Sequence, residues 1–276
     1  MEATKIFKRS SYNSESFKAG LIKLKLKSFE PKIQLSFKYK NFLIKTADTP
    51  EELNQVIRLR YEVFIKQGLG KFRIFNNDFD RLDLLGDHIV LIDTANNNKI
   101  IGTYRLICNS FSNQFYSESE FNISEFLKTP GIKLELGRAC IHKDYRNGLA
   151  IGLIWQGLAK YISLTSTDLL FGCTSVDTIH PFVATALYEN FKKDSVSYEF
   201  NISPKSKYKF GRIFKTIDDE PLKNYEKHIP TLLKSYLKAG AKIYSFPALD
   251  RDFKCIDFFT ILKVSEMSEK YKNKFF

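Results

Sequence analysis

A single carboxylate stands in an otherwise apolar stretch of this chain and could do proton-transfer chemistry. Glu135 belongs to the segment LELGRACIHKDYRNGLA over residues 134–150, in which leucines flank it on both sides. Burying a carboxylate is costly unless the group is paired or functional. A functional Glu135 would accept a proton, whereas the alternative is an ion pair with Arg138 or Arg105.

The same segment ends in a basic, glycine-containing turn, YRNGLA, that opens a predicted helix at Gly148. Free backbone N–H groups and the helix dipole favour an anion at such an N-terminus, and Arg146 adds positive charge. A phosphate would fit there, although glycine and arginine also occur at such junctions for capping alone.

Strands and helices must alternate around this segment to position it. Thr49-Pro-Glu-Glu52 is a capping box with proline at the first helical position, and Asn96-Asn-Asn98 lies in a predicted hairpin turn. We expect strands over residues 42–47, 88–93, 100–108, 133–141, 169–173, 242–246 and 256–264, with helices over 50–66, 148–165, 181–192 and 230–237. This order predicts an α/β fold with a mixed central sheet flanked by helices.

The charge of the chain is concentrated near its N-terminus. The 276 residues carry a net charge of +12, and residues 1–45 hold eleven Lys or Arg against three Glu, which gives +8. We therefore divide the chain into a basic extension (1–41) and a main domain (42–276). Such a segment attracts nucleic acid, anionic lipid or an acidic protein, unless it only reflects a Lys- and Asn-rich composition. Apolar and basic residues alternate over 21–27, which is typical of a strand or a membrane-surface segment.

Several classes of protein are excluded by composition. No run approaches 18 apolar residues, so we expect no spanning helix, and the N-terminus has no secretory signal. The four cysteines lie far apart, which fits buried free thiols in a reducing compartment rather than a zinc site or disulfides. Neither they nor the four histidines predict a metal. His88 and Asp93 match an O-acyltransferase spacing, but in a strand residues five apart face opposite sides.

The chain resembles the ornithine-lipid N-acyltransferases, also called hemolysin-like, over roughly residues 42–276. The resemblance rests on Glu135-Leu-Gly-Arg138 with His142-x-Asp144-Tyr145-Arg146, and it is extended by many ordered matches. These include the segments LRYEVF (59–64), GTYRL (102–106), FYSESEF (115–121), FGCTS (171–175), PTLLKSY (230–236) and GAKIYSFP (240–247). It implies a GNAT fold and a thioester of acyl carrier protein as the acyl donor.

A more distant resemblance to acyl-homoserine-lactone synthases implies a set of substrate-binding positions. That family's Arg, Phe, acidic pair, Arg, Glu and Arg fall on Arg60, Phe64, Asn77 with Asp80, Arg105, Glu135 and Arg138. Asn77 departs from the pattern, because those families carry Asp there, and the neighbouring Asp78 could compensate. Arg60 and Arg105 suit a carboxylate of an amino-acid acceptor, or else pair with Asp80 or Asp87.

The resemblance also implies catalytic roles. Glu135 would take a proton from the attacking amine, with Arg138 beside it, and backbone N–H groups of Ala139, Cys140 and Ile141 would bind the oxyanion. Tyr188 would protonate the departing thiol, or else only pack. The carrier's phosphopantetheine would meet the residues of the basic turn, which are Lys143, Arg146, Asn147 and Gly148. His142 could be a second base or a surface turn residue.

The sequence therefore predicts a cytoplasmic N-acyltransferase that peripherally contacts the inner face of an anionic membrane. Its co-substrates would be acyl carrier protein and an amino acid such as ornithine, with no tightly bound cofactor, no metal and no nucleic acid. The product would be a lyso-aminolipid or an N-acyl amino acid. The alternatives are an acyl-homoserine-lactone-like signal synthase and a non-catalytic lipid-binding protein on the same scaffold.

Overall fold

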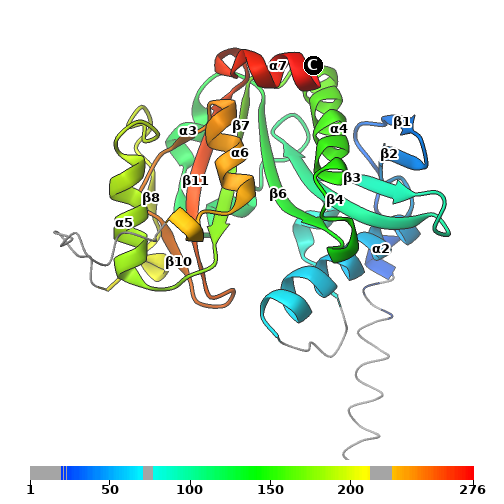
Figure 1. The fold of residues 1–276 in the computed structure, drawn as a ribbon, viewed down its shortest axis with the longest axis horizontal. Coiled ribbons are helices and arrows are strands. Elements are labelled where there is room, and N and C mark those ends of the chain that lie inside the picture. Colours follow the sequence, from blue (N-terminus) through cyan, green and yellow to red (C-terminus); the bar gives the residue numbers. More distant parts are fainter. Residues whose placement is uncertain (1–19, 21, 23, 71–76, 212–225) are drawn as a thin grey trace, which may run out of the picture. The chain divides into compact units, whose positions relative to one another are not determined.

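The computed structural model describes residues 20, 22, 24–70, 77–211 and 226–276, and these form two compact units (Figure 1). Unit 1 holds the residues up to Leu106 together with Arg138–Tyr161. Unit 2 holds Ile107–Gly137 and Ile162–Phe276. Strand β6 (Lys133–Ile141) has the bounds expected from sequence, and it begins in unit 2 and ends in unit 1.

Unit 1 is built on an antiparallel run of four strands. These are β1 (Ser36–Tyr39), β2 (Phe42–Thr46), β3 (Asp87–Asp93) and β4 (Lys99–Cys108). Asn97 and Asn98 take positive φ angles of 51° and 52° in the tight β3–β4 turn, which confirms the predicted hairpin. The last residues of β6 lie beside β4, since the His142 N–H donates to the Ile101 carbonyl at 2.7 Å.

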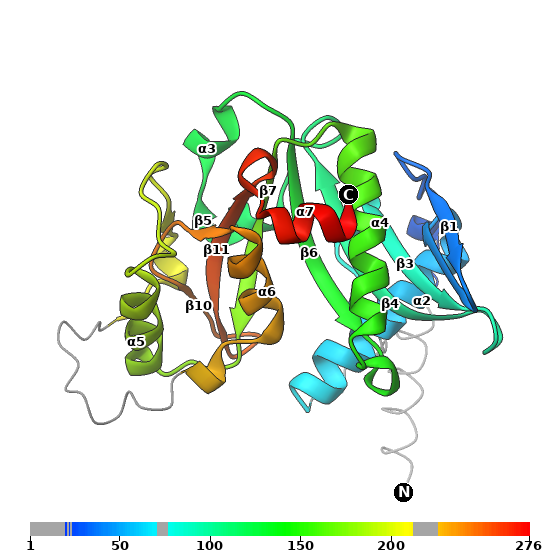
Figure 2. The ribbon, with the colours of Figure 1, turned by 45° about the horizontal axis from the view of Figure 1, so that its top comes forward.

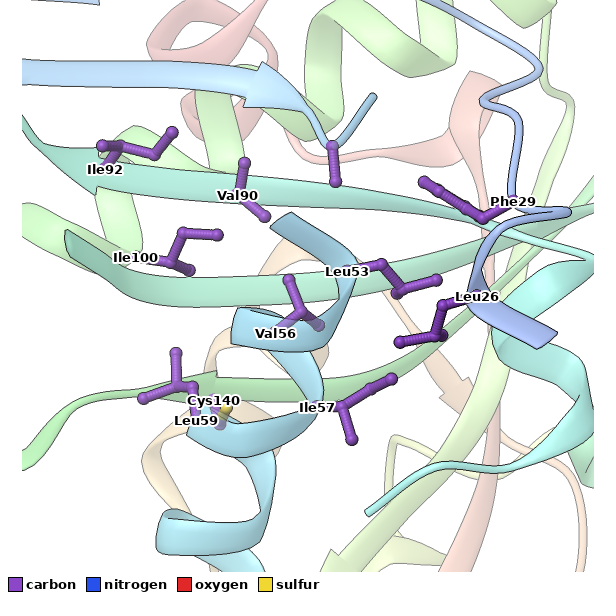
Figure 3. Close-up of a cluster of buried hydrophobic side chains, with 11 residues drawn as sticks. Leu26, Phe29, Leu53, Val56, Ile57, Leu59, Val90, Ile92, Ile100 and Cys140 are labelled. Carbon is purple, nitrogen blue, oxygen red and sulfur yellow. The ribbon is translucent and has the colours of Figure 1, made fainter. Parts of the chain in front are cut away.

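Helices cover both faces of the unit 1 sheet. Helix α2 (Pro50–Arg60) begins at Thr49, whose side chain accepts the Glu52 N–H, and it packs on β3 and β4 (Figure 3). Helix α4 (Leu149–Thr165) lies on the other face, where Gly157 approaches Ile44 and Ile89 (Figure 2). The single helix expected over 50–66 is divided into two types, since α2 ends at Arg60 and η1 (Tyr61–Gly68) is a π-helix. Such segments are rare and frequently lie at functional sites.

Part of the basic extension packs onto unit 1. Leu26 and Phe29 are 2% and 3% exposed and belong to the core cluster that α2 forms (Figure 3). The described residues among 20–26 are helical, so of the two interpretations of residues 21–27, a strand or a membrane-surface segment, the strand is wrong. Ile22 and Leu26 share a helical face that meets the core, whereas Leu24 is 63% exposed. Residues 1–19, 21 and 23 lie outside the described part of the chain.

Unit 2 has a mixed sheet. The first residues of β6 pair in parallel with β7 (Leu169–Val176), which pairs antiparallel with β11 (Cys255–Lys263). β11 also pairs with β10 (Ala248–Asp250) and with β9 (Lys242–Ile243), a strand shorter than the one expected over 242–246. The parallel and antiparallel pairs together give the mixed sheet predicted from sequence.

The two faces of the unit 2 sheet have different coverings. Helices α5 (Pro181–Phe191) and α6 (Thr231–Ala239) pack on the face that carries Ile256 and Phe258. Phe171 and Phe259, on the opposite face, join an aromatic cluster with Phe126 of α3 (Ser124–Lys128). The short elements are η2 (Arg81–Leu84), η3 (Tyr116–Ser119), β5 (Phe121–Asn122), η4 (Lys143–Tyr145), β8 (Ser203–Pro204), η5 (Ser206–Tyr208), η7 (Val264–Glu266) and α7 (Glu269–Phe275).

Two expectations about the chain as a whole are met within the described ranges. None of the helices there is both long and apolar enough to cross a bilayer. All four cysteines are free thiols, of which three are buried and Cys173 is half-buried, as predicted.

Candidate active site

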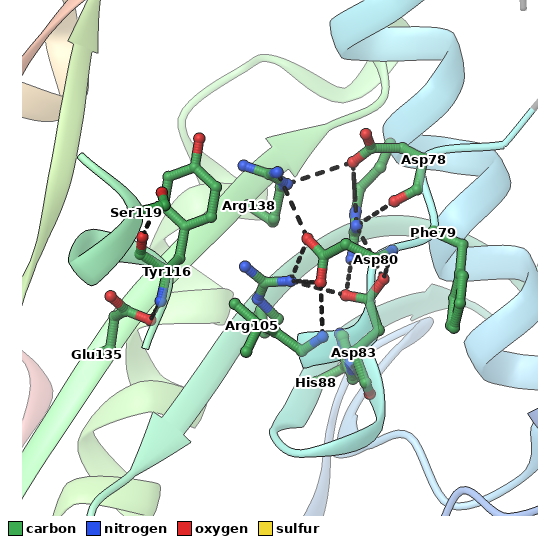
Figure 4. A network of polar contacts seen from close by, with 12 residues as sticks. Asp78, Phe79, Asp80, Asp83, His88, Arg105, Tyr116, Ser119, Glu135 and Arg138 are labelled. Atoms are coloured by element: carbon green, nitrogen blue, oxygen red, sulfur yellow. Dashed lines mark hydrogen bonds and ion pairs between the residues drawn. The ribbon is translucent and has the colours of Figure 1, made fainter. Parts of the chain in front are cut away.

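Glu135 is buried in unit 2 and is held by a helix N-terminus. Glu135 is only 3% exposed. Its carboxylate accepts the Tyr116 N–H at 2.8 Å and the Ser117 N–H at 2.7 Å (Figure 4). These are the first two residues of η3, where backbone donors lack partners within the helix. These two hydrogen bonds fix the orientation of the carboxylate.

The ladder between β6 and β7 ends at Glu135. Lys133 pairs with Leu169, and Glu135 pairs with Phe171, but β7 continues to Val176. Gly172, the next residue on β7, lies so close to β6 that an added Cβ atom would stand 2.4 Å from the Leu136 carbonyl oxygen. Only a residue without a side chain fits this approach. The candidate base thus stands where the two parallel strands stop pairing.

Three arginines and three aspartates form a buried network in unit 1 (Figure 4). Arg60, fully buried, contacts Asp78 at 3.0 Å through Nε and Asp83 at 2.6 Å through Nη1. Arg105 contacts both oxygens of Asp80 at 2.8 Å and one of Asp83 at 3.0 Å. Burial opposes the charge of Asp83, but Arg60 and Arg105 prevail and hold its pKa well below the ordinary range.

Arg138 completes this network. It lies 3.3 Å from Asp78 and 3.5 Å from Asp80. Asn77, the departure noted in the sequence, accepts the Phe79 N–H through its side-chain oxygen at 3.3 Å. Asp78 therefore supplies the carboxylate that Asn77 lacks, and the acidic pair of this chain is Asp78 with Asp80.

Arg105 keeps one buried donor available. The residue is 1% exposed, and its Nη2 atom meets no hydrogen-bond acceptor in the described part of the chain. Leaving such a donor unsatisfied is costly, so a substrate oxygen would be favoured there. Phe64, the other predicted binding residue of this unit, is half-buried in the π-helix against the core cluster.

The backbone of β6 is strained at Arg138, which takes a φ of 54° in the middle of the strand. A left-handed non-glycine residue is uncommon there and persists only when the surroundings hold it. It redirects the peptide groups that follow, which belong to Ala139, Cys140 and Ile141. Burial raises the pKa of the Cys140 thiol to about 12, which excludes this cysteine as a nucleophile at neutral pH.

The basic turn predicted to meet the carrier lies at the N-terminus of α4. Arg146 donates from Nε to the Ile141 carbonyl at 3.0 Å, and Asn147 caps the helix by accepting the Leu149 N–H at 3.2 Å. Gly148 takes a φ of 86°, and no atom stands within 4 Å of an added Cβ, so the helix starts next to open space.

A groove of about 490 Å³ lies beside this turn in unit 1. It carries four basic side chains against one acidic group, and it is lined by Gln55, Arg58, Leu59, Glu62, Lys66, Gln67, Lys99, Ile100, His142 and Lys143. His142 caps η4 through Nδ1, and burial and Lys99 lower its pKa. The groove is therefore a basic surface feature in which His142 serves as a turn residue.

Tyr188 is 9% exposed on α5 and packs edge-on against Phe246, with ring centroids 5.3 Å apart. Burial and the neighbouring Tyr198 raise its pKa to about 12. A phenol with so high a pKa is poorly matched to proton transfer near neutral pH.

The O-acyltransferase spacing of His88 and Asp93 lies on strand β3, as expected. His88 is fully buried and bonds through Nε2 to the Asp83 carbonyl at 3.0 Å, and burial lowers its pKa to about 4. Asp93 instead accepts the Tyr145 hydroxyl at 2.8 Å. The two side chains thus have separate partners.

Sequence reasoning missed three contributors to these sites. Asp83 is the most buried acid of the arginine network, and Tyr116 and Ser117 hold Glu135 through backbone groups. Three aspartates occur within six residues, at positions 78, 80 and 83, and this spacing in the sequence could have indicated an acidic partner for the arginines. The backbone N–H groups of Tyr116 and Ser117, by contrast, could not be predicted from residue type, because almost every residue has such a donor.

Comparison with known proteins shows what the chain as a whole is similar to. Residues 59–156 match the family described as Acetyltransferase (GNAT) domain. The L-ornithine N(alpha)-acyltransferase of Brucella abortus is 29% identical over 245 residues, covering 83% of this chain and 86% of the relative. The enzyme of the same name from Rhodobacter capsulatus is 27% identical over 84% of this chain and 93% of its own.

Among solved structures, the acyl-homoserine-lactone synthase LasI aligns with a TM-score of 0.48 and 13% identity, over 85% of this chain and 94% of that one. The ornithine N(alpha)-acyltransferases confirm the resemblance expected from the sequence, and the family match over residues 59–156 confirms the expected GNAT fold. This chain is an acyltransferase that carries a GNAT domain and is similar along most of its length to the L-ornithine N(alpha)-acyltransferases.

Proposed function

We propose that this protein transfers a fatty acyl chain from acyl carrier protein to the α-amino group of ornithine or a similar amino acid. The observation that carries the proposal is the 27–29% identity to four proteins named L-ornithine N(alpha)-acyltransferase, over 82–84% of this chain. The product would be an N-acyl amino acid, which is also a lyso-aminolipid.

Glu135 is the proposed general base. An α-amino group has a pKa near 8, so it is largely protonated at neutral pH and must lose a proton before it attacks. The amine nitrogen then forms a bond with the thioester carbonyl carbon, and the C–S bond breaks. Glu135 takes the proton from nitrogen, directly or through a water, and the leaving thiolate gains one. The position of Glu135 at the end of the β6–β7 ladder supports this assignment.

The oxyanion of the tetrahedral intermediate would be bound by backbone N–H groups of Ala139, Cys140 and Ile141. The left-handed φ of Arg138 supports this role, since strained backbone recurs where peptide groups are aimed at reacting atoms. We assign Tyr188 a packing role, because a thiol leaves as a thiolate without a strong need for an acid. Its contact with Phe246 favours that assignment.

Arg105 is proposed to bind a substrate carboxylate. Its unpaired Nη2 offers two N–H donors, while Asp80 and Asp83 hold Nη1 in place. Arg60 and Arg138 pair with the same aspartates, so the network holds Arg105 in place.

The proposed donor is acyl carrier protein rather than acyl-coenzyme A. A carrier protein is acidic, and the groove lined by Lys66, Lys99 and Lys143 offers complementary charge. The turn at Arg146 and Gly148 has a single glycine and suits the one phosphate of phosphopantetheine. No tightly bound cofactor is needed for this reaction.

The donor assignment is tested by comparing one acyl chain on the two carriers at low and high salt. We expect faster turnover with the carrier protein, and a rate that falls with salt as surface charges are screened. The double variant Lys99→Glu/Lys143→Glu should slow only that reaction, whereas Lys128→Glu, an exposed lysine on α3, is the matched control. Equal turnover with acyl-coenzyme A would contradict the assignment.

A peripheral membrane contact is also part of the proposal. Lys25, Lys27, Lys38 and Lys40 are exposed on the described part of the basic extension, and so is Leu24, the residue before Lys25. Each such lysine is worth about 1 kcal/mol near an anionic bilayer. Reversing Lys38 and Lys40 to Glu should weaken sedimentation with phosphatidylserine vesicles, and unchanged sedimentation would contradict this contact.

The function as a whole is tested by mass spectrometry of lipids from a host that expresses the protein. New amide-linked acyl amino acids are expected, and their masses would identify the acceptor and the chain length together. No new amide in cells that hold folded protein would contradict the proposal.

A further inference from the structure

Acidic groups gather on one face of the unit 2 sheet. In the register of the strands, Ser175 on β7 faces Asp257 on β11, and Cys255 on β11 faces Asp250 on β10. Residues two apart in a strand share a face, so Cys255 and Asp257 point the same way. Ligand atoms of Asp250, Cys255 and Asp257 all lie within 4.8 Å of one another, and the three residues are buried.

Glu120 adds a third carboxyl group to this acidic cluster. It directly follows η3 and is fully buried, and neither of its carboxyl oxygens has a partner in good hydrogen-bond geometry among the described residues. Burial and then the neighbouring carboxyl groups of Asp257 and Asp250 raise the pKa of Glu120 to about 9, whereas Tyr116 lowers it. Glu120 is thus a buried acid next to the cluster, and it forms no ion pair among the described residues.

No cation of the described chain neutralises these groups. Every ion pair found within that part of the protein joins other residues, and none involves Glu120, Asp250 or Asp257. Burying carboxylates without a counter-charge is costly, so these groups either hold protons or meet a positively charged ligand.

The acidic cluster adjoins the candidate base through one thiol. Cys173 lies two residues before Ser175 on the same face, and its Sγ is 3.5 Å from the hydroxyl oxygen of Ser117. Ser117 in turn donates its N–H to Glu135. Burial most of all, and also Glu120, Asp257 and Glu135, raise the pKa of Cys173, as expected for a thiol among carboxyl groups.

We propose that the acidic cluster formed by Glu120, Asp250 and Asp257 binds the side-chain ammonium group of a dibasic amino-acid acceptor, while the α-amine of the same molecule reacts at Glu135. This assignment rests on the proposed function. An ammonium group has three N–H donors and needs several acceptor oxygens around it, which the cluster provides. The positive charge that would balance the acidic cluster is thus supplied by the ammonium group of the substrate.

A metal ion fits these residues less well. Burial and Asp257 hold the pKa of Cys255 far above its usual range, so the thiol stays protonated, whereas a thiol must lose its proton to bind a metal. Asp250 already accepts two backbone N–H groups through one oxygen, and Asp257 accepts the Ser175 hydroxyl at 2.5 Å. The remaining oxygens suit hydrogen-bond donors.

The test compares ornithine with norvaline, which has the same carbon skeleton without the side-chain amine. We expect the wild-type enzyme to prefer ornithine in kcat/KM, and Glu120→Gln to reduce this preference by about 30-fold or more, since losing one partner of a buried charge pair is costly. Glu125→Gln, an exposed acid on α3, is the matched control and should keep the preference. Ornithine should also raise the melting temperature of the wild type more than that of Glu120→Gln.

The outcomes separate this inference from the function on which it rests. If the wild type acylates ornithine and norvaline equally well, the ammonium site is wrong while the acyltransferase function stands. If it acylates no amino acid, the proposed function itself fails. An unchanged preference in Glu120→Gln would overturn the site, and so would stoichiometric zinc or calcium in the purified protein that Asp257→Asn removes.

Discussion

Gly172 is the residue whose replacement should most directly test the arrangement of strands around Glu135. An alanine Cβ at this position would stand 2.4 Å from the Leu136 carbonyl oxygen, and ordinary contacts begin near 3.4 Å. Backbone on β6 or β7 must therefore move by about 1 Å in Gly172→Ala, because the clashing atom is not a flexible side chain. Leu136 directly follows Glu135, so the base moves with it.

Two consequences can be estimated. Overpacking of this kind typically costs about 1–3 kcal/mol of unfolding free energy. A displacement of about 1 Å at a reacting group can cost about 10²-fold in rate. We therefore expect Gly172→Ala to lower kcat about 100-fold, with a melting temperature several degrees below the wild type.

The assay combines thermal unfolding with steady-state acyl transfer. Gly152→Ala is the control, because no atom lies within 4 Å of a Cβ added there and alanine favours the helix over glycine by up to about 1 kcal/mol. Gly152→Ala should be as active as the wild type and no less stable. Wild-type activity and stability in Gly172→Ala would refute the role given to the closely packed end of the β6–β7 ladder.

Three further predictions concern stability and catalysis. Phe29→Ala should lower the unfolding free energy by about 3–5 kcal/mol in chemical denaturation, because Phe29 is 3% exposed in the core cluster, whereas Leu24→Ala at an exposed site should change it little. Tyr188→Phe should keep kcat within a few-fold of the wild type, whereas a 100-fold loss would show that Tyr188 acts as a general acid. The folded state raises the pKa of Glu120, so the contribution of Glu120 to the free energy of unfolding is present at low pH and declines as pH rises towards 9. Glu120→Gln should therefore reduce the pH dependence of the free energy of unfolding between about pH 6.5 and 9. An unchanged slope would contradict this prediction.

Much of the fold could be predicted because periodicity and capping act locally. Strand β6 has the expected bounds, and helices α4 and α5 begin or end within one residue of expectation. Thr49 and the asparagines of the β3–β4 turn carry signals that need no tertiary context. The π-helix η1 could not be foreseen in this way, since the same residues favour an ordinary helix.

The candidate site was less accessible to sequence reasoning. The arginines were expected to bind substrate or to pair with Asp80 or Asp87; Asp80 does pair with Arg105, but Asp87 accepts the Lys32 and Ile33 N–H groups instead. The acidic cluster around Asp257 was missed altogether. Glu120 directly follows η3, whereas Asp250 lies on β10 and Asp257 on β11, and the strand register brings the last two together.

The central claim is tested most directly by incubating the purified protein with an acyl-carrier-protein thioester and ornithine, and following the product by mass spectrometry. We predict Nα-acylornithine and free carrier thiol in equal amounts from the wild type. Glu135→Gln should remain folded and form both about 10²–10⁴-fold more slowly, as expected for loss of a general base. Wild-type turnover by folded Glu135→Gln, or release of the thiol without any amide, would contradict the account.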